Sequence, residues 1–332
     1  SRALYERYLL SRITGSSEMD RLEREVTRML RGSLQNYLEL ALDYGGNGLY
    51  DEGIEVLSRA MELKVTSNVA VSLSGASLTD GSKAMAYYYE GLLYMKKGEQ
   101  EKATKSFRMA SIQPTELVFP FRLEAYEALE AAIEIHPDDA AAHYYLGNLL
   151  FENQPEKAIS EWERSRALKP ESATVHRNLG IAYARLNNDI PAALASLEKA
   201  VEFAPGDPRL YLELDQLSER GKVAPAERLA RLEESQKVVD QDYSLLMREA
   251  SLYVQVGNYA KAIDLLESRH FHVWEGGGRI HDIFVDAYLA RGQQLLRDGD
   301  YSKALRDFRR ALDYPLNLEV GRPSHGGRAP EV

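Results

Sequence analysis

The sequence predicts an all-α fold, a solenoid in which antiparallel helix pairs stack one on the next. Residues 140–170 and 173–205 carry the same residue pattern with a period near 33 positions. Leu146-Gly147 of the first stretch recurs as Leu179-Gly180 of the second, and each stretch ends in a proline. Such a period is typical of repeat proteins, because one short repeat cannot bury its apolar face alone.

Each repeat has the small residues that closely packed helices require. Gly147 and Gly180 lie in the middle of the predicted first helices, where glycine costs roughly 1 kcal/mol relative to alanine. We therefore expect a neighbouring helix to approach closely at both glycines. Ala158 and Ala193 remove bulk from the second helices. The large residues expected to fill the space between the helices are Leu146, Leu150, Trp162, Leu179, Tyr183 and Leu197.

Prolines and an aspartate mark the predicted helix ends. Pro170 and Pro205 end the second helices, because proline lacks a backbone N–H and disfavours a helical residue before it. Asp207-Pro208 predicts the start of the next helix, with aspartate as the N-cap and proline in the first helical position.

Together these features resemble the tetratricopeptide repeat, whose pattern is L-G-x2-Y, then A-x3-F, then P, with a period of about 34 residues. The resemblance implies a right-handed superhelix of repeats that binds a partner on its concave face. We expect a helical cap at residues 1–33 and the solenoid at 34–332. The repeats are predicted near residues 34–67, 84–115, 123–137, 140–170, 173–205, 208–238, 242–269 and 279–315, followed by a loop tail at 316–332.

Three stretches interrupt this regular array. Residues 68–82 are small and polar and indicate a loop. Residues 115–122 leave no room for a first helix, so we expect 123–137 to be half a repeat. Residues 270–278, with the sequence HFHVWEGGG, form a third interruption.

Composition excludes several classes of function. The 332 residues carry a formal net charge of -10, which argues against nucleic acid or an anionic membrane as the main partner. There is no cysteine for a disulfide framework, and no apolar run reaches about 18 residues. The absence of a signal-peptide pattern favours the cytoplasm over secretion and leaves the localisation open. No carboxylate pair or Ser/His/Asp set has catalytic spacing, so we expect a non-catalytic protein without a cofactor.

Several segments have a narrower resemblance. They are FPFRLEA (119–125), HYYLGNLLF (143–151), VHRNLGIAY (175–183), LYLELDQL (210–217), HVWEGGGRIHD (272–282) and ALDYPLNLEVGRP (311–323). They resemble the C-terminal tetratricopeptide half of bacterial proteins whose upstream half is a galactose-mutarotase-like domain of unknown function. This resemblance implies a carbohydrate context. It also makes the upstream domain a candidate partner, beside an external protein or peptide.

The first helices supply the candidate ligand-binding residues. Those expected to face the groove are Tyr144, Asn148, Arg177, Asn178, Arg185 and Arg209. Some proteins of the family hold the C-terminal carboxylates of a peptide with a Lys-Asn-Asn-basic-basic clamp. Asn148, Asn178 and Arg209 match that pattern, whereas Tyr144 and Glu213 do not, and Glu213 would repel a carboxylate.

Two interpretations of this set stay open. Both asparagine amides can donate to and accept from a ligand backbone, and arginines suit anions. Alternatively, these residues are ordinary polar groups of a helix surface that neighbouring side chains satisfy.

The loops at 115–122 and 270–278 predict an alternative site. Phe119 and Phe121 in the first loop, with Trp274 and His272 in the second, would contribute to a glycan site. Packing of each loop by its own aromatic residues is the simpler interpretation. We expect no metal, because a site would require His270, His272 and His281 to converge from an irregular loop without cysteine. Self-association through exposed end repeats is a third possibility.

Overall fold

The computed structural model describes residues 2–30, 33–62, 82–115, 118, 120–272 and 279–320. Phe119, Trp274, the loop expected at 68–82 up to residue 81, and the tail beyond residue 320 lie outside these residues. Helices, turns and short connections make up the whole described part of the chain, in which no strand occurs. The chain divides into two compact units, Ser1–Leu179 and Gly180–Val332, and the predicted all-α fold is confirmed.

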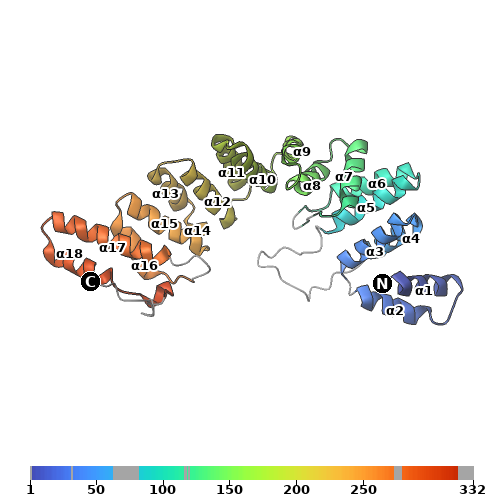
Figure 1. The fold of residues 1–332 in the computed structure, drawn as a ribbon, viewed down its shortest axis with the longest axis horizontal. Helices are drawn as coiled ribbons and strands as arrows, with labels where there is room; N and C mark the ends of the chain where they lie inside the picture. Colours follow the sequence, from blue (N-terminus) through green and yellow to red (C-terminus); the bar gives the residue numbers. More distant parts are fainter. Residues whose placement is uncertain are drawn as a thin grey trace, which may run out of the picture. The chain divides into compact units, whose positions relative to one another are not determined.

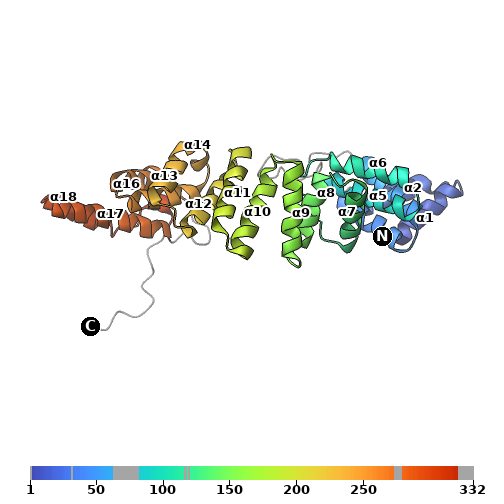
Figure 2. The ribbon, with the colours of Figure 1, turned by 90° about the horizontal axis from the view of Figure 1, so that it is seen from above.

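The first unit is a series of helices that lie side by side (Figures 1 and 2). They are α1 (Arg2–Ile13), α2 (Met19–Leu30), α3 (Leu34–Gly46), α4 (Tyr50–Glu62), α5 (Ser82–Lys96), α6 (Gln100–Ser111), α7 (Leu123–Ile135), α8 (Ala140–Leu150), α9 (Pro155–Leu168) and most of α10 (Ala173–Ala182). The helices pack as pairs, α1 with α2, α3 with α4, α5 with α6 and α8 with α9.

Helix α7 is the single helix between two pairs, and it packs against both α5 and α8. One side of α7 is formed by alanines and Leu129, which are buried. The short alanine side chains let α7 occupy a position between two first helices. Val118, which precedes α7 in the chain, is buried as well.

The second unit continues with the same architecture. It contains a π-helical turn (Tyr183–Asn187), α11 (Ile190–Phe203), α12 (Pro208–Arg220), α13 (Pro225–Glu234), α14 (Gln236–Val239), α15 (Tyr243–Gln255), α16 (Tyr259–Ser268), α17 (Arg279–Arg297), α18 (Tyr301–Arg310) and a 3-10 turn (Leu316–Leu318). Helix α15 packs on α16, and α17 packs on α18. The apolar faces of α15, α16 and α17 join one core, which includes Leu266 and Phe284.

The π-helical turn accommodates a difference in length between the two regular repeats. Leu150 and Tyr183 are 33 positions apart, whereas Ala158 and Ala193 are 35 apart, so the second repeat has two extra residues at its turn. The α-helix widens into a π-helical turn over Tyr183–Asn187. The next residue, Asn188, has a left-handed backbone with φ 49°. Ala193 therefore still reaches its buried position.

Aspartates begin many of the helices. Asp139 accepts hydrogen bonds from the N–H groups of Ala141 and Ala142 at 3.0 and 2.9 Å. Asp207 accepts from the N–H of Arg209 at 3.0 Å, with Pro208 in the first turn. The predicted N-cap at Asp207 is confirmed, and each such cap satisfies backbone donors that the helix leaves unpaired.

The predicted close approach at the helix glycines is confirmed. A Cβ atom on Gly147 would lie 2.5 Å from Cδ1 of Trp162, and one on Gly180 would lie 2.9 Å from Cγ of Leu197. Both distances are too short for real carbon atoms, so each large side chain occupies the space that glycine leaves. Trp162 is thereby buried directly beneath α8.

Candidate functional site

The two predicted asparagines of the first unit meet. Nδ2 of Asn178, on α10, donates a hydrogen bond to Oδ1 of Asn148, on α8, at 2.9 Å. The indole Nε1 of Trp162 donates to the same oxygen at 3.1 Å and to the carbonyl of Tyr144 at 3.2 Å. Trp162 therefore fixes the orientation of the Asn148 amide from below.

This arrangement determines which atoms of the asparagine pair remain for a ligand. Two donors occupy Oδ1 of Asn148, and Nδ2 of Asn178 is one of them. Among the described residues, no hydrogen bond involves Nδ2 of Asn148 or Oδ1 of Asn178. Both side chains are partly exposed. The pair thus offers one amide donor and one carbonyl acceptor, the two groups that a peptide backbone presents in complement.

The other two predicted residues of the first unit differ in accessibility. Tyr144 is only 8% exposed, and its ring packs on that of Tyr145 with centroids 5.3 Å apart. The buried ring supports α8 and offers little surface to a ligand. Arg177 is half-buried beside Asn178. The first unit therefore brings together Asn148, Asn178 and Arg177 on neighbouring first helices.

In the second unit, the predicted Arg185 lies at a hollow of about 310 Å³. The hollow is lined by Gly180, Ile181, Ala184, Arg185, Leu197, Glu213, Gln216, Leu217 and Arg220. Arg220 lies at the end of α12 and donates to the carbonyl of Ala184 at 3.1 Å and to Oδ1 of Asn188 at 2.8 Å. Arg220 thereby links α12 to the π-helical turn that contains Arg185.

Arg209 has a local partner. Its Nη2 lies 3.1 Å from Oδ2 of Asp207, the N-cap of the same helix. Arg209 and Glu213 lie on α12, and Glu213 lines the hollow while Arg209 does not. Arg209 and the hollow therefore do not form one anion-binding site in this structure.

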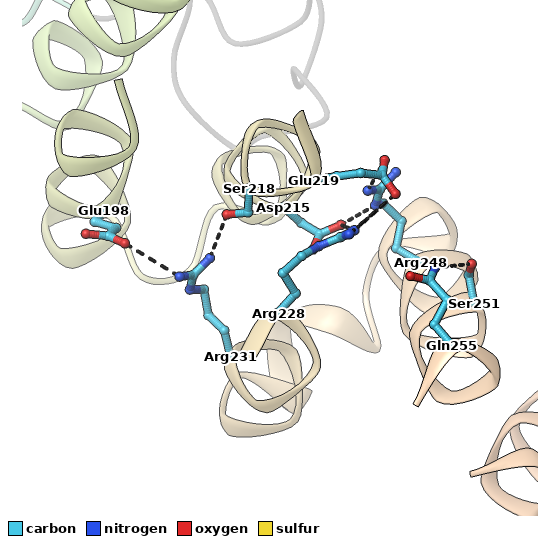
Figure 3. Close-up of polar contacts among 9 residues, drawn as sticks. All are labelled: Glu198, Asp215, Ser218, Glu219, Arg228, Arg231, Arg248, Ser251 and Gln255. Atoms are coloured by element: carbon cyan, nitrogen blue, oxygen red, sulfur yellow. Dashed lines mark hydrogen bonds and ion pairs between the residues drawn. The ribbon is translucent and has the colours of Figure 1, made fainter. Parts of the chain in front are cut away.

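A network of charged residues lies next along the second unit (Figure 3). The guanidinium of Arg228 donates to both carboxylate oxygens of Asp215, at 2.9 and 3.0 Å. The exposed fractions of these residues are 4% and 2%. Arg248, from α15, also contacts Asp215 and donates to Glu219 at 2.8 Å. The hydrogen bond from Arg248 holds the pKa of Glu219 below its usual range.

The network shares its arginines with a small hollow of about 140 Å³, lined by Glu219, Arg228, Met247, Arg248, Ser251, Gln255, Arg279 and Ile283. Three arginines and one carboxylate face this hollow. A larger hollow of about 690 Å³ over α17 and α18 is lined by Tyr288, Arg291, Leu295, Lys303, Arg306, Asp307, Arg309, Arg310 and Asp313. The second unit thus concentrates positive charge in its hollows although the chain as a whole is acidic.

The alternative loop residues are only partly described. Phe121 is 67% exposed, so its ring is open to solvent. His272 lies beside His270, and both imidazoles contact Oε1 of Glu319. Glu319, Arg220 and Arg248 are the residues that sequence reasoning did not select. A weak indication of Arg220 and Arg248 was present in the sequence, because both are basic residues of first helices. Nothing in the sequence indicated that Glu319 belongs to a site.

A family model described as tetratricopeptide repeat matches residues 123–154 and 149–208. Solved structures of repeat proteins are also similar to this chain. One is YrrB, described as a tetratricopeptide repeat protein with an unusual peptide-binding site, at 20% identity and a TM-score of 0.41 over 58% of this chain and 97% of that one.

Two others come from named bacteria. A tetratricopeptide repeat protein of Parabacteroides merdae has 17% identity and a TM-score of 0.35 over 84% of this chain and 91% of its own. One from Thermus thermophilus has 19% identity and a TM-score of 0.34 over 67% of this chain and 100% of its own.

Stacked helix pairs with polar residues along their first helices define a class, the helical-repeat interaction scaffolds. Within that class, residues 123–208 of this chain match the tetratricopeptide repeat family. Proteins of this kind are in general non-catalytic scaffolds that bind other proteins. Within the described part of the chain, no helix combines the length and the apolar character needed to cross a membrane.

Proposed function

We propose that this chain binds an extended segment of a partner protein across α8 and α10, with Asn148 and Asn178 as the main contacts. The observation that carries the proposal is the shared hydrogen bond between these asparagines. It leaves one donor and one acceptor on neighbouring first helices. A peptide backbone has an N–H and a C=O in every residue, so it can pair with both.

The hydrogen bond that orients the asparagine pair from beneath favours ligand binding over a purely structural role. Trp162 donates to Oδ1 of Asn148 and so fixes which atom of that amide remains outward. Binding to a preoriented amide loses less side-chain freedom than binding to a mobile one. Arg177, on the same helix as Asn178, adds a positive charge that suits acidic side chains in the partner.

Calorimetry with selected peptides tests this proposal. Peptides are selected from a displayed random library on the intact chain, synthesised, and titrated into the chain and into Asn178→Ala. The loss of one hydrogen bond, worth roughly 1 kcal/mol, predicts about fivefold weaker binding. Asn153→Ala is the matched control, because Asn153 is exposed just after α8. Equal affinity of the selected peptides for Asn178→Ala and the unaltered chain would overturn the proposal.

The partner itself has two candidate sources. The narrower resemblance of the sequence implies an upstream galactose-mutarotase-like domain, and we propose that domain as the first partner to titrate. Binding that Asn178→Ala weakens would make the groove an internal docking surface. Binding that the variant leaves unchanged would assign the upstream domain to another surface and leave the groove to an external protein.

A glycan site at the loops is the second candidate function. The observation that favours it is the exposed ring of Phe121, since aromatic rings in water are suited to stacking on a ligand. A glycan array with the intact chain and Phe121→Ala tests it. Signals that the variant loses would support this function, and an array without signals would remove it.

A further inference from the structure

Two histidines and a glutamate from distant parts of the chain converge in the second unit. Nε2 of His270 lies 2.8 Å from Oε1 of Glu319, and Nδ1 of His272 lies 3.1 Å from the same oxygen. The three ligand atoms all lie within 4.8 Å of one another. The two imidazole rings meet edge to face, with their centroids 4.9 Å apart.

The backbone that carries these side chains is held in place on both sides. The N–H of Phe271, which lies between the two histidines, donates to the carbonyl of Asn317 at 2.7 Å. The side-chain amide of Asn317 donates in turn to the carbonyls of Leu266 and Arg269, at 2.8 and 2.7 Å. These bonds fasten the segment after α16 to the 3-10 turn after α18.

Buried neighbours fix the positions further. Phe271 and Leu318 are both buried in the core of the second unit. Each lies directly beside a member of the cluster, so the exposed imidazoles and carboxylate extend from anchored residues. Glu319 also has a left-handed backbone, with φ 50°. Non-glycine residues adopt this conformation rarely, and such strain is concentrated at ligand sites.

We propose that His270, His272 and Glu319 bind a divalent transition metal of the zinc class. Two imidazole nitrogens and one carboxylate oxygen are a donor set that zinc accepts, with water in a fourth position. Tetrahedral bonds of roughly 2.0–2.1 Å place neighbouring ligand atoms about 3.3 Å apart. The nitrogen–oxygen distances in the cluster are slightly shorter, so small side-chain rotations admit the ion.

The bound metal would join two segments that lie 47 positions apart in the chain. It would replace the hydrogen bonds from the imidazoles to Glu319 by three metal–ligand bonds. A ligand that binds only the folded state stabilises that state. The site is therefore expected to raise the thermal stability of the second unit, in addition to holding its last turn against α16.

Calorimetric titration of Zn²⁺ into the chelator-treated full chain, prepared without a histidine tag, tests the proposal. We expect one equivalent to bind, with about tenfold or greater loss of affinity in His270→Gln and in Glu319→Gln. Asp298→Asn is the matched control, because Asp298 is an exposed carboxylate of the same unit. Circular dichroism of each variant without metal establishes that it is folded.

Co²⁺ provides a second measurement that reports the ligands directly. Substitution of Co²⁺ should give the intense visible absorption of a four-coordinate ion, and Glu319→Gln should remove it. Absence of stoichiometric binding, or binding that Glu319→Gln and Asp298→Asn share equally, would overturn the proposal. Binding that depends on the histidines but not on Glu319 would also overturn the three-ligand site.

Discussion

Trp162 and Asn148 are joined by a hydrogen bond from the indole Nε1 to Oδ1, 3.1 Å long, across the contact between α9 and α8. The bond connects a core residue to a candidate ligand-binding residue. Changes in packing beneath α8 should therefore reach the groove. The first prediction tests the packing itself, and the second tests its connection to the groove.

Gly147→Ala should destabilise the first unit by about 1–3 kcal/mol, because the added Cβ would lie 2.5 Å from Trp162. Chemical denaturation followed by circular dichroism measures the effect. Gly46→Ala is the matched control, since a Cβ there meets nothing within 4 Å. Equal stability of the two variants would contradict the close approach of α9 to α8.

Trp162→Phe should weaken binding of a selected peptide more than its modest loss of stability explains. Phenylalanine keeps an aromatic ring beneath α8 but has no N–H to donate, so the Asn148 amide loses the contact that orients it. The expected loss is about fivefold, as for one hydrogen bond. Titration at a temperature where the variant is fully folded separates affinity from stability, and unchanged affinity would refute the orienting role.

Asp139→Asn should change how stability depends on pH. Asp139 is buried beside Tyr88, and burial raises its pKa above the usual range for a carboxyl. Between the unfolded and folded pKa values, the folded state binds more protons than the unfolded state. Stability of the natural chain therefore falls as pH rises through that window.

Asparagine is a good N-cap and carries no charge, so the variant should lack this slope. Its stability relative to the natural chain should be greater at pH 7 than at pH 4. Thermal denaturation at both values measures the difference. Asp189→Asn, at the exposed N-cap of α11, is the control. An Asp139→Asn advantage that is the same at both pH values would disprove the assignment.

Asp215→Ala should destabilise the second unit by about 3–5 kcal/mol, because it leaves the buried guanidinium of Arg228 without its bidentate partner. Glu219→Ala removes a carboxylate from the exposed edge of the same network (Figure 3) and should cost about 0–1 kcal/mol. Urea denaturation of the two variants compares them. Similar losses would show that burial of Asp215 does not determine its contribution.

The sequence predicted the fold well, because the tetratricopeptide pattern is local to each repeat. Gly147, Trp162 and the cap at Asp207 follow from spacings within about 35 residues. The asparagine pair was selected by its positions on successive first helices, and the structure brings the two amides into contact. Their use as ligand-binding residues stays a prediction.

Contacts between side chains far apart in the chain could not be predicted in this way. The bond from Trp162 to Asn148 depends on how the indole ring is turned beneath Gly147, which no spacing encodes. Arg228 and Arg248 meet Asp215 from two different helices. Glu319 meets His270 and His272 where Asn317 fastens its turn to Arg269. The sequence of the histidine-containing loop gives no indication of this acidic partner.

The π-helical turn at Tyr183–Asn187 shows that this repeat array accepts a change of chain length. Two extra residues are taken up there while Ala193 keeps its buried place. A connection between two helices of this array can therefore hold extra residues without shifting the register of the next helix.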